Sequence, residues 1–338
     1  MCDLNISFNK SLNSSLISVC SVQPDAFANS KNPRHPLQLP PRSMVRRSPR
    51  LNPPAKEPFF TGVLYPFTTS LFFNRICTLA AAMVLVSALA EVSASTPYGR
   101  FGNPGQGILT VAIDSRLGWF LMELPCSLVF VYQFFYVGGA QSKKPMPRFF
   151  AFMFCCHYLY RGWVFPYMLN VHPGSKNFDV GIAFGSWSVT VLHGYLNAKW
   201  YAEHGTHLVA PVKRKKSKKT FWSSDIRFRV GICMYYSGFI STIYHDHLMR
   251  TLRPCEGGAR YCIPHGGLFE YVTMGAYLSE LWCWLGFAIA SFGPNGAFIF
   301  LVSLVNLVPR SHATHSWYLN KFPEYQELGR ARLVPGLW

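Results

Sequence analysis

The residues of this chain that could do chemistry are concentrated in Tyr244–Trp284, where one apolar segment ends and another begins. Asp246, Arg250 and Arg253 are spaced by four and then three residues, so on a helix they share one stripe. Arginine forks suit phosphate or carboxylate, and Gly266-Gly267 allows the backbone to approach a ligand closely. The pattern indicates an anion-binding site, although a helix end with arginines that snorkel to the membrane surface fits the same spacing.

A second group of candidates lies inside apolar segments. Glu123 occurs in RLGWFLMELP, His157, Tyr158 and Arg161 occur in HYLYRGWVFP, and Glu280 follows the loop described above. Ionisable side chains inside a bilayer are costly and usually functional. A single carboxyl group could simply bond to a neighbouring helix. Carboxyl groups, a tyrosine and an arginine from separate segments favour an internal polar cavity.

Positioning these residues requires a membrane framework. Half of the 338 residues are hydrophobic and 14% are charged, against roughly 25% charged in soluble domains. Several apolar runs approach 20 residues, which is the length of a helix that crosses a bilayer. We therefore expect an all-α polytopic membrane protein with about seven transmembrane helices that enclose an intramembrane cofactor and substrate cavity. The expected spans are 71–90, 117–137, 149–169, 180–199, 228–248, 272–292 and a short 296–308.

The chain divides into two parts. Residues 1–57 are rich in Ser, Asn and Pro with several arginines and few acids, so we expect a disordered basic tail. A transit peptide is an alternative interpretation of this segment. Residues 58–338 are expected to form the seven-helix domain.

The net charge limits the classes of partner that we expect, and the positions of the cysteines indicate their role. The net charge of +17 comes largely from the tail and loops, including the basic run 213–219, and suits anionic headgroups and phosphorylated ligands. Because no soluble basic fold is available, we expect membrane lipids and no nucleic acid as partners. The ten cysteines lie mostly in apolar runs, which indicates small core residues and not a disulfide framework.

A series of motifs, weak singly but specific in their order, resembles the steroid 5α-reductase (3-oxo-5α-steroid 4-dehydrogenase) family from about Tyr98 to Trp338. They are TPYGRFG at 96–102, WFLMELP at 119–125, HYLYR at 157–161, HDHLMRTLRP at 245–254, IPHGGLFEYV at 263–272, YLSELWCW at 277–284, WYLNKFPEY at 317–325 and RLVP at 332–335. The early motifs favour the steroid-reducing branch over the related enoyl-CoA and polyprenol reductases, which share mainly the carboxyl-terminal part. The chain is identified as a divergent member.

The resemblance implies an oxidoreductase that uses NADPH to reduce the C=C bond of a 3-oxo-Δ4-steroid or a similar lipid enone. Glu123 and Tyr158 match the family pair that contacts the 3-ketone. Hydride addition to the β-carbon moves negative charge onto the ketone oxygen. A tyrosine hydroxyl and a carboxyl group kept protonated by burial can donate to that developing enolate.

The cofactor positions also follow from the resemblance. The carboxyl-terminal part, about 190–338, is the expected NADPH-binding region. The matched cofactor-binding residues are Tyr98, Arg100, Asp246, Arg253, Glu280 and Tyr318. Other polar positions of the family pattern are replaced, and the replacing residues include Met122, His193, Thr242, His245, Ala276 and Thr314. The steroid side of the site is therefore better matched than the nicotinamide side.

Two other classes of function stay open. The lost polar positions favour a non-catalytic sterol-binding protein, a decayed reductase. The histidines of HGTH, HDH and HATH could indicate a di-iron oxygenase or desaturase, because imidazole clusters suit iron. Such enzymes need HxxHH boxes, which the sequence lacks, so we assign no metal ligand.

Location and orientation complete the expectations. We expect a multi-pass protein of the endoplasmic reticulum that acts as a monomer on a steroid or another apolar enone lipid. The positive-inside rule alone would place loop 250–271 and the carboxyl terminus in the lumen. We expect them on the cytosolic side, because the cofactor implied by the resemblance is supplied from the cytosol.

Overall fold

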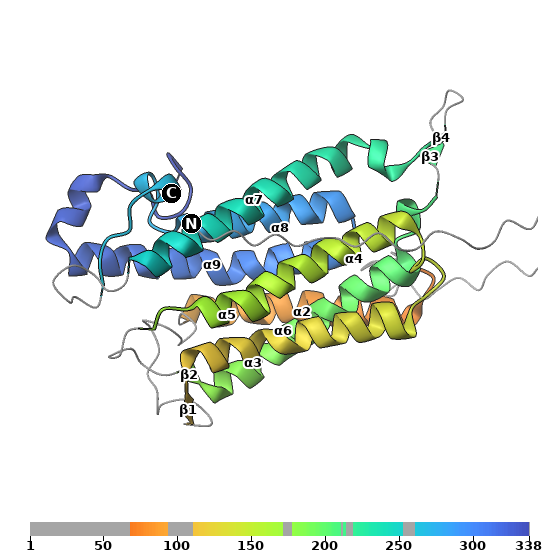
Figure 1. Ribbon diagram of the computed structural model, residues 1–338, viewed down its shortest axis with the longest axis horizontal. Helices are drawn as coiled ribbons and strands as arrows, with labels where there is room; N and C mark the ends of the chain where they lie inside the picture. The colour runs from red at the N-terminus through yellow and green to blue at the C-terminus, as the bar shows by residue number, and fades with distance from the viewer. Residues whose placement is uncertain are drawn as a thin grey trace, which may run out of the picture. The chain divides into compact units, whose positions relative to one another are not determined.

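The computed structural model describes residues 68–93, 111–171, 178–210, 212–213, 219–252 and 261–337. The expected tail 1–57, the first-loop residues Tyr98 and Arg100, and Arg253 lie outside the described residues. Helices dominate the described part of the chain (Figure 1), which confirms the expected all-α class.

Seven long helical segments run through the described part of the chain. They are α2 (Leu71–Ser93), α3 (Ser115–Val131) with the π-helix Tyr132–Val137, α4 (Pro145–Tyr158) with the π-helix Leu159–Val164 and α5 (Phe165–Met168), α6 (Val180–Lys199) with the π-helix Trp200–His204, α7 (Ile226–Thr251), α8 (Gly275–Ser291) and α9 (Pro294–Lys321). Short 3₁₀ turns cover Thr206–Leu208, Trp222–Ser224, Gly267–Glu270 and Pro323–Leu328.

Two small antiparallel strand pairs join loops outside the helices. β1 (Ala112–Ile113) pairs with β2 (Phe178–Asp179), and β3 (Val212–Lys213) pairs with β4 (Lys219–Thr220). The β1–β2 pair precedes both α3 and α6, so it holds the starts of these two helices together.

Aspartate side chains begin three of the long helices. Asp114 accepts hydrogen bonds from the backbone N–H groups of Arg116 and Leu117 at the start of α3, the first at 2.8 Å. Asp179 caps α6 and Asp225 caps α7 in the same way. An N-cap acceptor satisfies backbone donors that have no partner within the helix.

Within the described residues, three helices are long and apolar enough to cross a membrane by length and composition alone, namely 71–91, 115–137 and 294–321. The expected count of seven spans therefore remains a prediction.

The extent of the last expected span was wrong. We expected a short helix at 296–308, but the structure has α9 there, a helix of 28 residues. The fall in hydropathy after Val308 does not end the helix, because Pro309 is tolerated inside it and Arg310 is buried with its Nε donating to the Tyr277 hydroxyl at 3.0 Å.

Close helix contacts fix the geometry of the interior. A Cβ atom at Gly238 of α7 would lie 2.5 Å from the backbone nitrogen of Cys283 on α8. A Cβ atom at Gly194 of α6 would lie 2.6 Å from the carbonyl oxygen of Cys126 on α3. Small residues let helix backbones approach in this way. The second contact matters for function, because Cys126 is three residues after Glu123.

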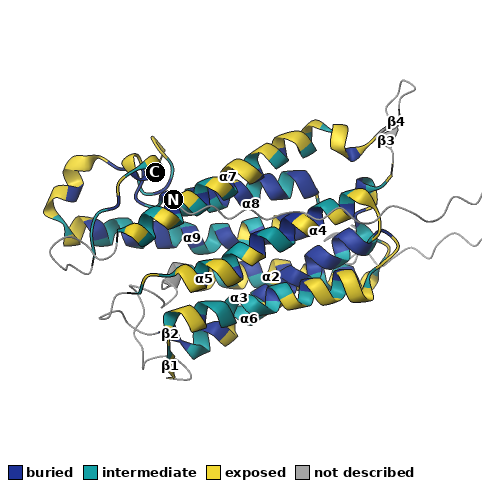
Figure 2. Cartoon of the chain, viewed as in Figure 1, coloured by how far each residue is buried: buried dark blue, intermediate teal, exposed yellow. Residues whose placement is uncertain are grey.

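The core is rich in aromatic rings, and the buried sides of the helices face one another in the cartoon coloured by exposure (Figure 2). Phe130 of α3 stacks on Phe154 of α4 with ring centroids 4.1 Å apart. Six described cysteines are free, as expected for small core residues, and Cys262 is an exception because it is disulfide-bonded.

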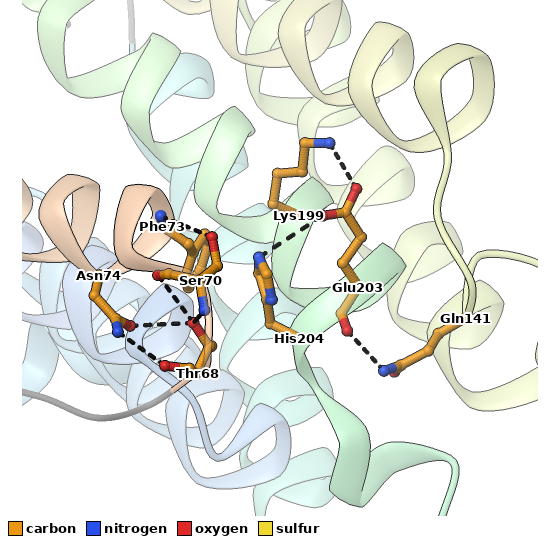
Figure 3. Close-up of polar contacts among 8 residues, drawn as sticks. All are labelled: Thr68, Ser70, Phe73, Asn74, Gln141, Lys199, Glu203 and His204. Carbon is orange, nitrogen blue, oxygen red and sulfur yellow. Dashed lines mark hydrogen bonds and ion pairs between the residues drawn. The ribbon is translucent and has the colours of Figure 1, made fainter. Parts of the chain in front are cut away.

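A polar cluster closes the end of α6 (Figure 3). Glu203 pairs with Lys199 at 2.7 Å and with His204 at 3.8 Å, while its carbonyl accepts from the Gln141 amide at 2.9 Å. The His204 ring also lies 4.2 Å from the ring of Phe73 in the first turn of α2. These contacts join α2, the turn after α3 and the end of α6.

Candidate functional site

A cavity of about 430 Å³ lies between α2, α3, α4, α6, α8 and α9. Its ionisable lining residues are Glu91, Glu123, His157, Tyr158, Arg161, His193 and Glu280. The remaining lining includes Trp119, Trp284 and several aliphatic side chains. Cavities of this composition, mostly apolar with a few convergent polar groups, are typical of small-molecule sites.

Arg161 lies between the two cavity carboxyl groups. Its Nη2 is 3.4 Å from Oε2 of Glu280 on α8, and its Nε is 3.9 Å from Oε1 of Glu123 on α3. The guanidinium group also lies over the rings of Trp119 and Phe165, at 4.8 and 5.3 Å from the centroids. Arg161 therefore holds the two acids in one ion-pair cluster with an aromatic wall.

The backbone around Arg161 is specialised for this contact. Leu159–Val164 is a π-helix, a distortion that is frequent at functional sites because it redirects side chains. Gly162, in the same segment, approaches the Glu123 side chain so closely that an added Cβ would lie 3.3 Å from the Glu123 Cβ. The local fold thus brings α4 and α3 together at the acid.

Tyr158 is the last residue of α4 and is 5% exposed. Its ring centroid lies 4.7 Å from that of Phe154 and 5.6 Å from that of His193. The adjacent His157 packs between Phe239 and Trp284 at 4.8 and 4.3 Å. The phenol is therefore held in an aromatic frame at the edge of the cavity.

The structure brings three of the expected site residues together, since Glu123, Tyr158 and Glu280 line the same cavity. Asp246 and Tyr318 are not among its described lining residues. Asp246 accepts a hydrogen bond from the Tyr160 hydroxyl at 3.2 Å. Because Tyr160 precedes Arg161, a single π-helical segment contacts both Asp246 and the cavity acids.

Tyr318 lies in a separate aromatic stack near the carboxyl-terminal end of α9. Its ring is 4.9 Å from that of Tyr325 and 5.7 Å from that of Phe322. It is 2% exposed, and its hydroxyl lies 3.5 Å from the carbonyl oxygen of Cys262. In this structure Tyr318 therefore contacts the loop segment that precedes α8.

Loop 261–274 packs on the end of α7. His245 accepts a hydrogen bond from the Leu268 N–H at Nε2, at 2.9 Å, and its Nδ1 lies 2.7 Å from the Ser241 carbonyl oxygen. Gly267 has φ +56°, and a Cβ there would lie 2.8 Å from the His245 Nε2. The close approach expected at Gly266-Gly267 is therefore made to α7.

Arg330 and Glu270 tie this loop to the chain end. Arg330 is buried and donates to the Pro264 carbonyl at 2.7 Å, and it lies 3.5 Å from the Glu270 carboxylate. The Gly266 N–H donates to Glu270 and holds the pKa of its carboxyl below its usual range, with further help from His265 and Arg330.

The sequence predicted an internal polar cavity that includes an arginine, but it assigned no binding or catalytic role to Arg161, His193 or Asn306. Arg161 was noted as an intramembrane charge, and the replacement at His193 was visible, but their shared cavity depends on packing. Asn306 on α9 lines the cavity, and its Oδ1 is buried without a hydrogen-bond partner among the described residues.

The paired histidines lie in unrelated contacts. His207 contacts the Ser291 carbonyl oxygen at 3.1 Å, His247 contacts Arg250 at 2.7 Å, and His315 contacts the Thr273 hydroxyl at 2.5 Å. Within the described ranges, no three His, Cys, Asp or Glu residues are grouped so that they could hold a metal ion.

These features define an all-helical protein with apolar helices of membrane length and an internal cavity that holds a tyrosine and an acid–arginine–acid cluster. The family described as 3-oxo-5-alpha-steroid 4-dehydrogenase matches residues 176–338. The chain is 31% identical over 271 residues to 3-oxo-5-alpha-steroid 4-dehydrogenase 1 of Mus musculus, a match that covers 78% of this chain and 98% of that protein. It is 30% identical over 243 residues to steroid 5-alpha-reductase DET2 of Gossypium hirsutum, covering 72% of this chain and 88% of that protein.

The chain therefore belongs to the steroid 5α-reductase family. Mammalian and plant relatives match over a similar share of the chain. The resemblance read from the ordered motifs is confirmed.

Proposed function

We propose that this protein is a multi-pass oxidoreductase of the endoplasmic reticulum membrane that reduces the C=C bond of a 3-oxo-Δ4-steroid or a similar apolar enone with NADPH. Membership of the family supports the reaction class. The observation that carries the finer proposal is the placement of Glu123, Tyr158 and the Arg161–Glu280 pair in one cavity.

Glu123 and Tyr158 are proposed to donate hydrogen bonds to the ketone oxygen. As the β-carbon accepts hydride, negative charge develops on that oxygen, and donors already in place stabilise it. Tyr158 donates its phenolic O–H, and Glu123 donates as the protonated acid. The resulting enolate takes a proton at the α-carbon to give the saturated ketone.

The charge count around Arg161 supports a protonated Glu123. Two carboxyl groups share one guanidinium, so full ionisation would leave a net negative charge in a largely apolar cavity, which is unfavourable. The contact of Arg161 with Glu280 is the shorter of the two, 3.4 against 3.9 Å, so we take Glu280 as the ion-pair partner of Arg161. The extra proton then resides on Glu123, where it is available to the ketone oxygen.

NADPH would supply the hydride, and the chain has groups that fit its parts. Asn306 presents to the cavity a buried Oδ1 that has no partner among the described residues, which suits the amide N–H of a carboxamide.

Arg116 and Arg250 border a separate hollow of about 460 Å³ at the ends of α3, α5 and α7. Guanidinium groups there suit phosphates. Tyr98, Arg100, Asp246, Arg253 and Tyr318 are cofactor candidates from the family motifs alone.

The test is reduction by the purified full-length chain in detergent or lipid nanodiscs. A 3-oxo-Δ4-steroid incubated with NADPH should gain 2 Da, and 4-deuterated NADPH of the reactive face should deliver one deuterium to the β-carbon. A panel of 2-enoyl-CoAs run in parallel tests the enoyl-CoA alternative. NADPH binding without turnover of any enone would contradict the proposal and favour a sterol-binding protein.

A further inference from the structure

His193 is a buried cavity residue that the mechanism above does not use. It lies on the cavity face of α6 and is 1% exposed. Its ring centroid is 5.2 Å from that of Phe154, 5.6 Å from that of Tyr158 and 5.6 Å from that of Trp284. The Nε2 atom has no hydrogen-bond partner among the described residues. A buried polar atom of this kind needs an explanation.

The neighbouring Asn197 determines which ring nitrogen carries the proton. Asn197 Nδ2 lies 2.9 Å from the His193 carbonyl oxygen and 3.0 Å from the His193 Nδ1. Because a carbonyl oxygen can only accept, the Asn197 atom beside it must be the NH₂ group and not the amide oxygen. The second N–H of that group then points at Nδ1, which must be an unprotonated acceptor.

The far side of the amide agrees with this orientation. Asn197 Oδ1 accepts from the Tyr201 hydroxyl at 3.1 Å and from Asn295 Nδ2 at 2.8 Å, and all three residues are fully buried. A neutral imidazole with an acceptor at Nδ1 carries its hydrogen on Nε2. The unpartnered atom of His193 is therefore an N–H donor, held in that state by a network that extends from α6 to α9.

We infer that His193 is a further substrate-binding residue whose Nε2–H donates to the carbonyl oxygen of the ligand at the end of the cavity next to Tyr158. This inference rests on the proposed function, because it requires a ligand with an acceptor at that end. The rings of Phe154, Tyr158 and Trp284 surround the imidazole. His157 lines the same cavity and its buried Nδ1 also has no partner among the described residues, so a water shared by the two histidines is the competing occupant that the binding test below must distinguish.

If the Nε2–H of His193 donates to the ligand carbonyl, the cavity should bind ligands with a ketone more tightly than ligands without one. The probes are a tritiated 3-oxo-Δ4-steroid and its 3-deoxo-Δ4 counterpart, with equilibrium binding to the full chain in nanodiscs as the readout. His193→Phe keeps a ring and removes the donor, and we expect about tenfold weaker binding of the 3-oxo ligand with unchanged binding of the 3-deoxo ligand. His193→Gln keeps an N–H and should stay within about threefold of wild type.

Ser188→Ala is the matched control. Ser188 lies on the same helix but is exposed, and its hydroxyl donates a hydrogen bond to the Gly185 carbonyl within that helix. Equal losses for both ligands in His193→Phe would show a packing role and overturn the inference. Unchanged 3-oxo binding in His193→Phe would overturn it as well, while leaving the proposed function intact. If the Phe variant does not fold, as judged by size-exclusion chromatography, His193→Leu replaces it.

Absence of 3-oxo binding and turnover in the wild-type chain would instead contradict the proposed function, and the inference with it. The two failures are therefore distinguishable from the wild-type measurement alone.

Discussion

Arg161 and Glu280 are 119 positions apart in the sequence, yet their side chains meet at 3.4 Å across the cavity. Their side chains are 18% and 15% exposed, so the contact is largely shielded from solvent. Glu123 also lies 3.9 Å from the same guanidinium, and we propose that this ion pair influences the charge state of the acid. The pair therefore links the packing of α4 against α8 to the chemistry of the ketone.

Removing Arg161 should destabilise the protein through its stranded acids. Arg161→Leu leaves Glu123 and Glu280 without the guanidinium group that they share. Loss of one partner of a fully buried pair costs about 3 kcal/mol or more. We expect a smaller loss of stability here, because the side chains are partly exposed to the cavity. We expect a fall of several degrees in the unfolding temperature in detergent, which Arg161→Leu combined with Glu280→Gln should largely restore. A double variant as unstable as the single one would contradict the ion-pair role.

Substitutions at the two proposed donors test the chemistry. Glu123→Gln keeps a donor and should retain measurable turnover with weaker dependence on alkaline pH. Glu123→Ala should lose on the order of a hundredfold in turnover, and Tyr158→Phe a comparable amount. The double variant should lose less than the sum, because both donors serve one oxygen. Initial rates on the best enone measure this, and wild-type turnover in Glu123→Ala would remove the assigned role.

Arg253, a family-matched residue outside the described part of the chain, is expected to bind a cofactor phosphate. Arg253→Ala should raise the apparent dissociation constant for NADPH roughly tenfold or more, because a charge-assisted hydrogen bond is worth about 1.5–3 kcal/mol. Turnover at saturating cofactor should change less. Titration of NADPH at fixed steroid gives both quantities, and an unaltered constant would exclude Arg253 from the site.

Membrane orientation can be measured directly. We expect loop 250–271 and the carboxyl terminus on the cytosolic side, because the cofactor must enter there and loop charge only biases insertion. An N-glycosylation acceptor fused after Trp338 should stay unmodified in cells, whereas the same acceptor on the opposite side should be glycosylated. Modification of the carboxyl-terminal tag would reverse the predicted topology.

Acid should loosen loop 261–274 through Glu270. The Gly266 N–H and the neighbouring cations hold the pKa of this carboxyl below its usual range. Its contribution to stability is therefore complete above the unfolded value of about 4.3 and is lost as the pH falls through the lower folded value. The protection factor of the Gly266 amide, which is the intrinsic exchange rate at each pH divided by the observed rate, should fall over that window. Glu270→Gln should show little pH dependence, and an identical profile in both proteins would exclude Glu270 as the cause.

The sequence predicted the helices better than their contacts. Apolar runs located most helices to within a few residues, and Asp114, Asp179 and Asp225 are recognisable start signals. The extent of α9 was missed because Pro309 and the polar residues after it imitate a helix end, while tertiary contacts such as that of Arg310 extend the helix.

Within the site, the ordered motifs identified Glu123, Tyr158 and Glu280 as individual candidates. The convergence of Glu123 and Glu280 on Arg161 and the Asn197–Asn295 contact behind His193 depend on helices that meet only after folding. No local pattern encodes partners separated by about a hundred residues. The π-helix of Leu159–Val164 is also invisible to periodicity, because its single extra residue does not interrupt the apolar run.

That extra residue makes the site sensitive to chain length. Tyr158 ends the α-helical part of α4, and Arg161 lies within the π-turn that follows. Deleting one residue between them would convert the turn to regular α-helix and change the angle between Tyr158 and Arg161 around the helix axis. In a relative with both residues but a one-residue gap here, we expect the distances from the guanidinium to the two acids to differ from those in this chain. Insertions and deletions in this turn should therefore alter the geometry of the cavity without changing any of its lining residues.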